Sequence, residues 1–341
     1  MLKYLFPFIE TFLLTIGLVF FALPLAKKIP WDVRDDLRHI HRKGVYRIGG
    51  IAMVLAFNLV VIFNKDLVMS SELFGFILAS IILLFVGVWD DIKEVYWKTQ
   101  LFFQIAISVL IFILGVRIYY ITNPLNGGVI DLDLGKTVLI ALLLVIFWVV
   151  FVINSLNWID GVDGLSGGVS LISVATIFFL SFRPEVNQPP IAIMCSILAG
   201  AILGFLVFNF NPAKILAGTS GSMFMGFSLA VLAIFSGTKI ATAILVLTIP
   251  LVDFIWVICE RINKGESIFR PDNNHLHHKL LEIGWSQRKI AVYYYLITAI
   301  IGVIALNTRV IGKSITLLIS ILIVIFISLE TRRKLAKLHR S

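Results

Sequence analysis

Charged residues are scarce in this chain. Lys, Arg, Asp and Glu make up 14% of its 341 residues, whereas 59% are hydrophobic and the mean hydropathy is +0.98. A soluble domain of ordinary composition carries about 25% charged residues. The deficit excludes an ordinary soluble domain and predicts an integral membrane protein.

Cysteine is nearly absent as well. Only Cys195 and Cys259 occur, and both fall in apolar segments. Two isolated cysteines provide neither a disulfide framework nor the spacing of a cysteine-based metal site. The chain therefore belongs to neither of those classes.

Long apolar runs dominate what is present. Because about 20 apolar residues span a bilayer, we expect an all-α polytopic membrane protein that forms one domain over residues 1–341. About eleven transmembrane helices are predicted, at 4–26, 48–64, 72–89, 99–116, 137–153, 168–182, 190–208, 222–237, 240–258, 291–306 and 313–329. An odd number of spans places the two termini on opposite sides of the membrane.

The basic residues predict the orientation. Most of the 29 Lys and Arg fall in segments 27–47, 89–98, 209–221, 259–290 and the basic tail 330–341, which share one side of the membrane. By the positive-inside rule this side is cytoplasmic, so the N-terminus lies outside and the C-terminus inside. The net charge of +9 then reflects topology and attraction to anionic head groups, not nucleic-acid binding.

One segment on the outer side carries strand signals. Residues 118–121 and 129–132 are rich in β-formers and flank Asn126-Gly127-Gly128. This pattern predicts a short external β-hairpin, to which we assign no chemistry.

One polar run interrupts the apolar segments. Asn154, Asn157, Asp160 and Asp163 recur at every third residue between apolar residues 138–153 and 169–182. A carboxylate at the bilayer centre costs ~2.5–3.5 kcal/mol, so the run lies at a helix mouth or serves chemistry, and we expect both. The glycines of segment 161–168 predict that the helix breaks here, and glycine-rich backbone beside carboxylates suits phosphate and metal binding. A plain polar turn leaves unexplained why this cytoplasmic loop lacks Lys and Arg.

Two further polar motifs lie on the same side. Asp90 and Asp91 end the predicted helix 72–89, where they oppose the helix dipole and repel each other, so a bound cation or a catalytic role explains them better than an exposed acidic cap. Gly218-Thr219-Ser220-Gly221-Ser222 immediately precedes the predicted helix 222–237. Free amides at a helix N-terminus form an anion site, although Ser and Gly also make ordinary caps.

Half of the six histidines fall within four residues of the longest cytoplasmic segment. His275, His277 and His278 follow Arg270, and no Cys or further His completes a zinc site. A surface loop is one interpretation, but a cationic, hydrogen-bonding cradle for phosphate or sugar explains the composition better. Lys43 and Gly49-Gly50 close the first cytoplasmic loop, where glycine permits close approach of backbones.

Together these motifs resemble the polyprenyl-phosphate N-acetylhexosamine-1-phosphate transferases, the membrane family that includes MraY and the WecA/TagO-type enzymes. The resemblance covers essentially the whole chain, and the form of the histidine segment is more similar to the WecA/TagO branch. The motifs are Lys43 with Gly49-Gly50, Asp90-Asp91, the run from Asn154 to Leu165, Asn209 ahead of Lys214, residues 218–222, and His275-Leu276-His277-His278. Of these, the 154–165 run is the most specific.

The resemblance implies a reaction at phosphorus. Polyprenyl (undecaprenyl) phosphate would attack the β-phosphorus of a UDP-N-acetylhexosamine such as UDP-N-acetylglucosamine, UMP would leave, and Mg²⁺, with Mn²⁺ as an alternative, would screen the diphosphate. The lipid-diphospho-sugar product would serve cell-envelope glycan synthesis. The active site would face the cytoplasm at the cell inner membrane, and a homodimer is compatible with the sequence.

The resemblance also implies residue roles. Asp90, Asp91, Asp160 and Asp163 would be catalytic, with Asp91, Asp160, Asp163 and position 219 near the metal. The expected substrate-binding residues are Lys43, Asn154, Asn157, Asn209, Ser220, Gly221, Arg270, His275, His277 and His278. Asn209 would lie near uracil.

One position departs from the family pattern. The family has Gly-Asp-x-Gly-Ser at residues 218–222, and its Asp is the principal Mg²⁺ ligand, whereas this chain has Thr219. A neutral hydroxyl is a weak ligand for this hard cation. Three interpretations are open: Asp160 or Asp163 holds the metal instead, the chain keeps only lipid or nucleotide binding, or Thr219 is a deliberate substitution that traps a bound state.

Two other classes compete with a transferase. A transporter of lipid-linked phosphate suits polar helix mouths, but it needs polar groups near mid-membrane or on both faces, and the motifs here share one face. A membrane metallohydrolase built on the histidines predicts a tightly bound transition metal in the purified protein.

Overall fold

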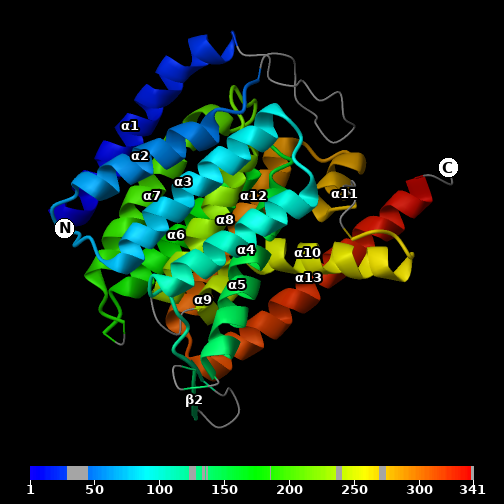
Figure 1. Cartoon of the computed structure of the whole chain (residues 1–341). Coiled ribbons are helices and arrows are strands. Elements are labelled where there is room, and N and C mark those ends of the chain that lie inside the picture. The colour runs from blue at the N-terminus through cyan, green and yellow to red at the C-terminus, as the bar shows by residue number, and fades with distance from the viewer. Residues whose placement is uncertain are drawn as a thin grey trace.

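The computed structural model describes residues 1–28, 45–122, 128–132, 135, 137–184, 186–235, 240–268 and 274–338, and most of them are helical (Figure 1). The helices are α1 (Leu2–Ala26), α2 (Gly49–Phe63), α3 (Ser71–Ile92), α4 (Trp97–Ile113), α5 (Thr137–Ile159), α6 (Leu165–Ser181), α7 (Pro189–Asn209), α8 (Gly218–Phe235), α9 (Ile240–Val246), α10 (Thr248–Asn263), α11 (Leu276–Glu282), α12 (Gln287–Asn307) and α13 (Val310–Leu338). Strands β1 (Tyr120–Thr122) and β2 (Val129–Asp131) pair antiparallel, with Ile121 opposite Ile130. Figure 1 shows β2 at the end of the molecule away from α11.

The bundle is built from apolar helices of membrane-spanning length. In the described residues, seven helices are long and apolar enough to cross a membrane, or up to eight if the bent pair α9–α10 counts as one span. The shorter apolar helices α2, α4 and α6 pack among them. The chain is therefore a multi-pass membrane protein. Each predicted span overlaps one of these helices, and the count of eleven crossings stays a prediction.

The predicted span 240–258 corresponds to a bent pair of helices. α9 and α10 meet at Leu247 with a bend of 77°. Pro250 lies in the first turn of α10, where it has no N–H to donate to the Val246 carbonyl and its ring would clash with that carbonyl in a continuous helix. The bend turns α10 toward α5 and α13, which both contact it (Figure 1).

Helices α5 and α8 reach beyond their predicted ends into the polar motifs. α5 continues beyond Ile153 to Ile159, and α8 begins at Gly218 instead of residue 222. Polar side chains are accommodated within these turns: the Asn154 amide donates to the Val150 carbonyl at 2.8 Å, and the Ser222 hydroxyl to the Gly218 carbonyl at 3.0 Å. The predicted break follows at residues 160–164, where Gly164 has φ +77°, a conformation that favours glycine.

α8 forms the centre of the bundle. Of its apolar window 89% is buried, against 17% for α1 and for α13. α2, α3, α5 and α6 all pack against α8. The outer faces of α1 and α13 expose large apolar side chains such as Phe21 and Ile311, as lipid-facing helices do.

The beginning of α8 is wedged between α2 and α3. A Cβ at Gly50 would lie 2.2 Å from the Gly221 nitrogen, and a Cβ at Gly87 would lie 2.2 Å from Ser220 Cα. Backbone bonds join the same parts, since the Gly50 amide donates to the Ala217 carbonyl at 2.9 Å. The sequence-based expectation of close backbone approach at Gly50 therefore agrees with this geometry.

Replacing Gly50 by Ala is expected to destabilise the protein by about 1–3 kcal/mol, because the new methyl group has no space against the α8 backbone. Thermal unfolding of the purified protein measures the effect. Gly17→Ala is the matched control, since nothing lies within 4 Å of a Cβ at that helical position. Equal unfolding temperatures for the two variants would contradict the wedge.

Candidate active site

The N-terminus of α8 binds an anion, and that anion is the chain's own Asp91. Its carboxylate, fully buried at the end of α3, accepts hydrogen bonds from the Thr219 amide at 2.8 Å and from the Ser220 amide and hydroxyl at 3.3 and 2.9 Å. The Arg47 guanidinium lies 3.7 Å from Asp91 Oδ1. The amides predicted to form an anion site, and Ser220 predicted to contact substrate, thus hold Asp91, which the α8 dipole stabilises.

Asp90 meets a different set of donors. Its Oδ1 accepts from the Val95 amide at 2.9 Å and from the Gln100 side-chain amide at 2.8 Å. Its Oδ2 accepts from the Thr219 hydroxyl at 2.6 Å. Thr219, at the position where the resemblance implies a carboxylate, is therefore a hydrogen-bond donor to Asp90.

The surroundings of Asp90 and Asp91 do not fit a resident magnesium ion. N–H and O–H donors face both carboxylates, and Arg47 places positive charge beside Asp91. Within the described part of the chain, no three His, Cys, Asp or Glu side chains lie together so that they could hold a metal ion. Asp91, Asp160 and Asp163 therefore do not form such a group in this structure.

The two asparagines of the polar run fasten α5 to its neighbours. The Asn154 side chain forms two hydrogen bonds with Gln104 of α4. Its Nδ2 donates to Gln104 Oε1 at 2.7 Å, and its Oδ1 accepts from Gln104 Nε2 at 3.4 Å. Asn157 accepts from the Ser222 hydroxyl of α8 at 2.6 Å. Asn157 therefore contacts the first turns of α8, whose N-terminal amides bind the Asp91 carboxylate.

The two aspartates of the run lie in the turn between α5 and α6. Asp160 is half-buried and accepts a short hydrogen bond from Ser166. Asp163 is buried, and its Oδ2 accepts from the Asn211 side chain at 2.8 Å and from the Ala213 amide at 3.0 Å. Asp163 therefore joins this turn to the segment between α7 and α8.

Both polar atoms of the Asn209 side-chain amide form hydrogen bonds with backbone groups. Its oxygen accepts from the Gly164 amide and its nitrogen donates to the Ile215 carbonyl, each at 2.9 Å. The side chain is buried at the end of α7. Asn209 holds the turn at Gly164 in place, which is a different use from the uracil contact that the resemblance implies.

The first of the three histidines contacts a carboxylate that was not identified from the sequence. Asp253 of α10 is buried, and its Oδ2 lies 2.8 Å from His275 Nδ1. Its Oδ1 accepts from the Leu276 amide at 2.9 Å, at the start of α11. One side chain therefore orients both His275 and the helix that carries the other two histidines.

His277 is completely buried, with 0% of its surface exposed. Burial, and then the neighbouring rings of His278 and His275, hold the pKa of its imidazole well below the ordinary value. Among the described residues neither ring nitrogen of His277 has a hydrogen-bond partner. This direction opposes the charged form that the sequence led us to expect for His277, and the cradle for phosphate or sugar stays a prediction.

The turn after α5 and the histidines meet at Gly161. A Cβ there would lie 2.8 Å from His277 Nε2 and 3.2 Å from His278 Nε2. Since Asn157, one helical turn earlier, contacts Ser222, the polar run connects the Asp90–Asp91 region to the histidines. Lys43 and Arg270, also predicted to bind substrate, lie outside the described residues.

Two more residues near the histidines were missed from sequence. The Trp158 ring meets the His275 ring edge-on with centroids 5.1 Å apart, and the Arg261 guanidinium lies 4.9 Å from the Trp158 centroid. Arg261 and Asp253 could have been noticed, because ionised residues within or beside an apolar span are rare and usually functional. For Trp158 no sequence signal was available, because aromatic residues are common throughout the chain.

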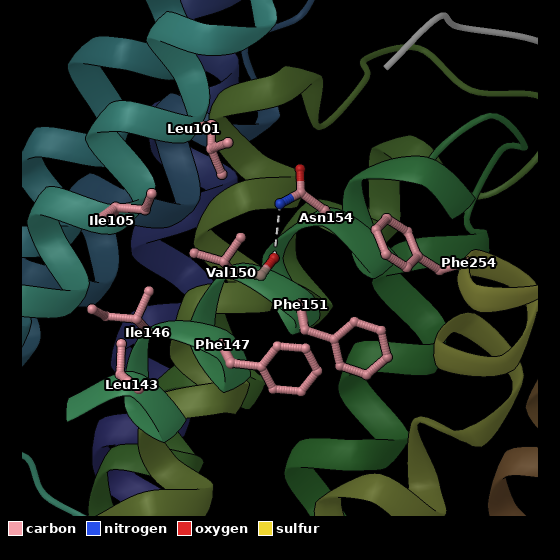
Figure 2. Close-up of a pocket in the computed structure, with 9 residues that line it drawn as sticks. All are labelled: Leu101, Ile105, Leu143, Ile146, Phe147, Val150, Phe151, Asn154 and Phe254. Carbon is pink, nitrogen blue, oxygen red and sulfur yellow. Dashed lines mark hydrogen bonds between the residues drawn. The ribbon is translucent and has the colours of Figure 1, made fainter. Parts of the chain in front are cut away.

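An apolar groove of about 350 Å³ runs along α4 and α5 to Asn154. Figure 2 shows the lining residues, with the Asn154 amide at one end and its hydrogen bond to the Val150 carbonyl. The groove is lined by Leu101, Ile105, Leu143, Ile146, Phe147, Val150, Phe151, Asn154 and Phe254. A long apolar molecule with a polar end suits this shape.

Fold and site define a multi-pass membrane protein with acidic, amide and histidine side chains gathered at its helix ends. Residues 73–237 match the family model described as glycosyl transferase family 4. The chain is 31% identical to the decaprenyl-phosphate N-acetylglucosaminephosphotransferase of Mycobacterium leprae, over 83% of this chain and 78% of that protein. It is 26% identical to the probable undecaprenyl-phosphate N-acetylglucosaminyl 1-phosphate transferase of Bacillus subtilis, over 94% and 90%.

A third relative is named for a different sugar substrate. The phospho-N-acetylmuramoyl-pentapeptide-transferase of Bacillus pumilus is 29% identical, over 88% of this chain and 96% of that protein. The chain therefore belongs to glycosyl transferase family 4, the polyprenyl-phosphate N-acetylhexosamine-1-phosphate transferases.

Proposed function

We propose that this chain transfers N-acetylhexosamine 1-phosphate from a UDP-sugar to polyprenyl phosphate and releases UMP. Undecaprenyl phosphate and UDP-N-acetylglucosamine are the expected substrates, and the lipid-diphospho-sugar would enter cell-envelope glycan synthesis. The observation that carries this proposal is the apolar groove that ends at Asn154, one turn before Asn157 and its bond to α8. The groove would take the isoprenoid, and the polar helix ends would take the phosphates.

The reaction needs positioning and charge neutralisation more than covalent work by the protein. An oxygen of the lipid phosphate forms a bond to the β-phosphorus, and the bond from that phosphorus to the bridging oxygen breaks, so that UMP leaves with the electron pair. Asp90 takes up the proton of the lipid phosphate. Asp91 holds the α8 N-terminus, and thereby keeps Thr219 against Asp90.

The histidines suit the donor sugar phosphate. His277 and His278 lie against Gly161. The buried ring nitrogens of His277, which have no hydrogen-bond partner among the described residues, gain more from a ligand than solvated ones do. Asp253 fixes His275 through Nδ1, which leaves Nε2 for substrate. Asp160 and Asp163 shape the turn between these histidines and Asn209.

We propose that Mg²⁺, with Mn²⁺ as a substitute, arrives on the diphosphate of the UDP-sugar. In phosphoryl-transfer sites Mg²⁺ is commonly held by substrate phosphates with one or two carboxylates, not by an all-protein cage. This arrangement agrees with the absence of a three-residue metal group among the described residues. The cation would neutralise the diphosphate charge.

The proposed orientation puts the site in the cytoplasm. The polar helix ends lie among the basic segments, so the positive-inside rule places them at the cytoplasmic face of the cell inner membrane. The N-terminus and the β1–β2 pair would then lie outside, and α2, α4 and α6 would complete eleven crossings. Residues 330–341 would extend into the cytoplasm, and two chains could pair through apolar helices.

The direct test is release of UMP from UDP-N-acetylglucosamine and undecaprenyl phosphate, with and without Mg²⁺. We expect release that depends on both substrates, together with a lipid-linked product. A folded protein that binds the UDP-sugar and releases no UMP with any UDP-N-acetylhexosamine would instead favour a binding or transport role.

Narrowing the groove is expected to raise the KM for the lipid substrate without affecting the KM for the UDP-sugar. Ile146→Trp would displace roughly two methylene groups of the isoprenoid, which raises the KM for polyprenyl phosphate by about tenfold. The KM for the UDP-sugar would not change. Leu139→Trp, on the exposed surface of the same helix, is the control. A KM for lipid that stays the same in both variants would place the isoprenoid elsewhere.

A further inference from the structure

The basic end of α13 contacts the elements that carry the histidines. α13 remains helical to Leu338, and its Arg332 forms an ion pair with Glu260 of α10. The Glu260 carboxylate also lies 3.6 Å from Lys279 of α11. Figure 1 shows the last turns of α13 beside α10 and near α11, and both helices contact it.

α11 needs such external contacts. It has seven residues, which is too short for a helix to be stable by itself in water. One face of α10 contacts the chain before and within α11 at three points. Arg261 donates to the Ile268 carbonyl at 2.6 Å. Asp253 accepts from the Leu276 amide, and Glu260 forms an ion pair with Lys279. The position of the histidines therefore depends on α10.

Glu260 is in turn positioned by Arg332. Lys264, which is 49% exposed, lies 3.1 Å from Oε1, whereas Lys279 and Arg332 both meet Oε2. Glu260 itself is mostly buried, at 12% exposed, and the Arg332 guanidinium also lies 5.3 Å from the Trp256 ring centroid. A planar guanidinium held on a ring is a more rigid partner than either lysine.

We propose that Arg332 and Glu260 are positioning residues, through which the end of α13 sets the place of α11 and its histidines. This goes beyond a basic tail that only attracts anionic head groups. The inference about α11 stands on the ion pairs alone, and only its consequence for turnover rests on the proposed function.

The experiment compares three variants in lipid nanodiscs: Arg332→Gln, Arg332→Lys and Arg333→Gln. Arg333→Gln is the matched control because it removes the same charge one residue away. The Arg333 side chain is 74% exposed and pairs with Glu330 of its own helix. The first readout is hydrogen–deuterium exchange of residues 276–282. The second is the KM for the UDP-sugar against the KM for the lipid.

In Arg332→Gln we expect the α11 amides to exchange roughly 3- to 30-fold faster and the KM for the UDP-sugar to rise by a similar factor. The lipid KM stays unchanged, Arg332→Lys recovers part of the loss, and Arg333→Gln behaves as the unaltered chain. Equal effects of Arg332→Gln and Arg333→Gln would identify a head-group anchor and overturn the proposal.

The two readouts separate this inference from the proposed function. If no variant and not even the unaltered chain releases UMP, the transferase assignment fails, while the exchange data still decide whether Arg332 holds α11. If Arg332→Gln does not fold, Lys279→Gln breaks the same link from the other side. Unchanged exchange in α11 of that variant would equally overturn the proposal.

Discussion

Asp90→Asn is expected to lower UMP release by about 10²–10⁴-fold, the range that one general base contributes. Asn keeps the shape of Asp90, and its oxygen still accepts from the Val95 amide. The Thr219 hydroxyl can rotate to accept from the new amide nitrogen, so the fold is retained. What the substitution removes is the negative charge that takes up a proton.

The measurement is the initial rate at saturating substrates, beside thermal unfolding and UDP-sugar binding for the same preparation. We expect kcat to fall while the unfolding temperature and the UDP-sugar affinity stay close to those of the unaltered chain. A variant that keeps most of its activity would remove Asp90 from the mechanism.

Thr219→Asp is expected to create a divalent-cation site and to raise UMP release in Mg²⁺ by at least ~10-fold, since changes around a bound metal typically alter affinity or activity by 10–100-fold. The new carboxylate would replace the hydroxyl that now donates to Asp90 at 2.6 Å. Two adjacent carboxylates without a donor between them repel, and a hard cation relieves that repulsion.

Binding of Mn²⁺, followed by electron paramagnetic resonance, reports the new site without reference to activity. Thr219→Asn is the matched control, because it has the same size as Asp without the charge. We expect tight Mn²⁺ binding in Thr219→Asp alone. Equal Mn²⁺ binding by the unaltered chain would show that Asp160, Asp163 or Asp91 already holds a cation with Thr219 in place.

The helices could be predicted from sequence, since apolar length is a local property. The bend within 240–258 has a local cause as well, because Pro250 cannot continue the helix from α9 although the hydropathy continues through it. α5 and α8 extend beyond their predicted ends because polar residues that were expected to end them are accommodated within the helix. Asn154 and Ser222 look like helix breakers in sequence, yet each bonds to a carbonyl one turn back.

The candidate site could be predicted in its residue types but only partly in its contacts. Asp90, Asp91 and the polar run were identified because carboxylates beside apolar segments are costly. The role of Asp253 was missed although a carboxylate within an apolar span is itself a signal, because no local pattern pairs it with His275, 22 residues later. Asn209 was expected near uracil, and the structure uses both ends of its amide on backbone.

Sequence alone therefore determined that this chain is a polytopic membrane protein and indicated its family, because hydropathy and motif spacing are read residue by residue. Only the tertiary structure decided what stabilises Asp91. The sequence suggested a cation or a catalytic role, whereas the hydrogen-bond donors to Asp91 come from the N-terminus of α8, 128 residues away for the Thr219 amide. A helix end placed against a buried carboxylate does the work of a counter-charge, and only folding brings the two together.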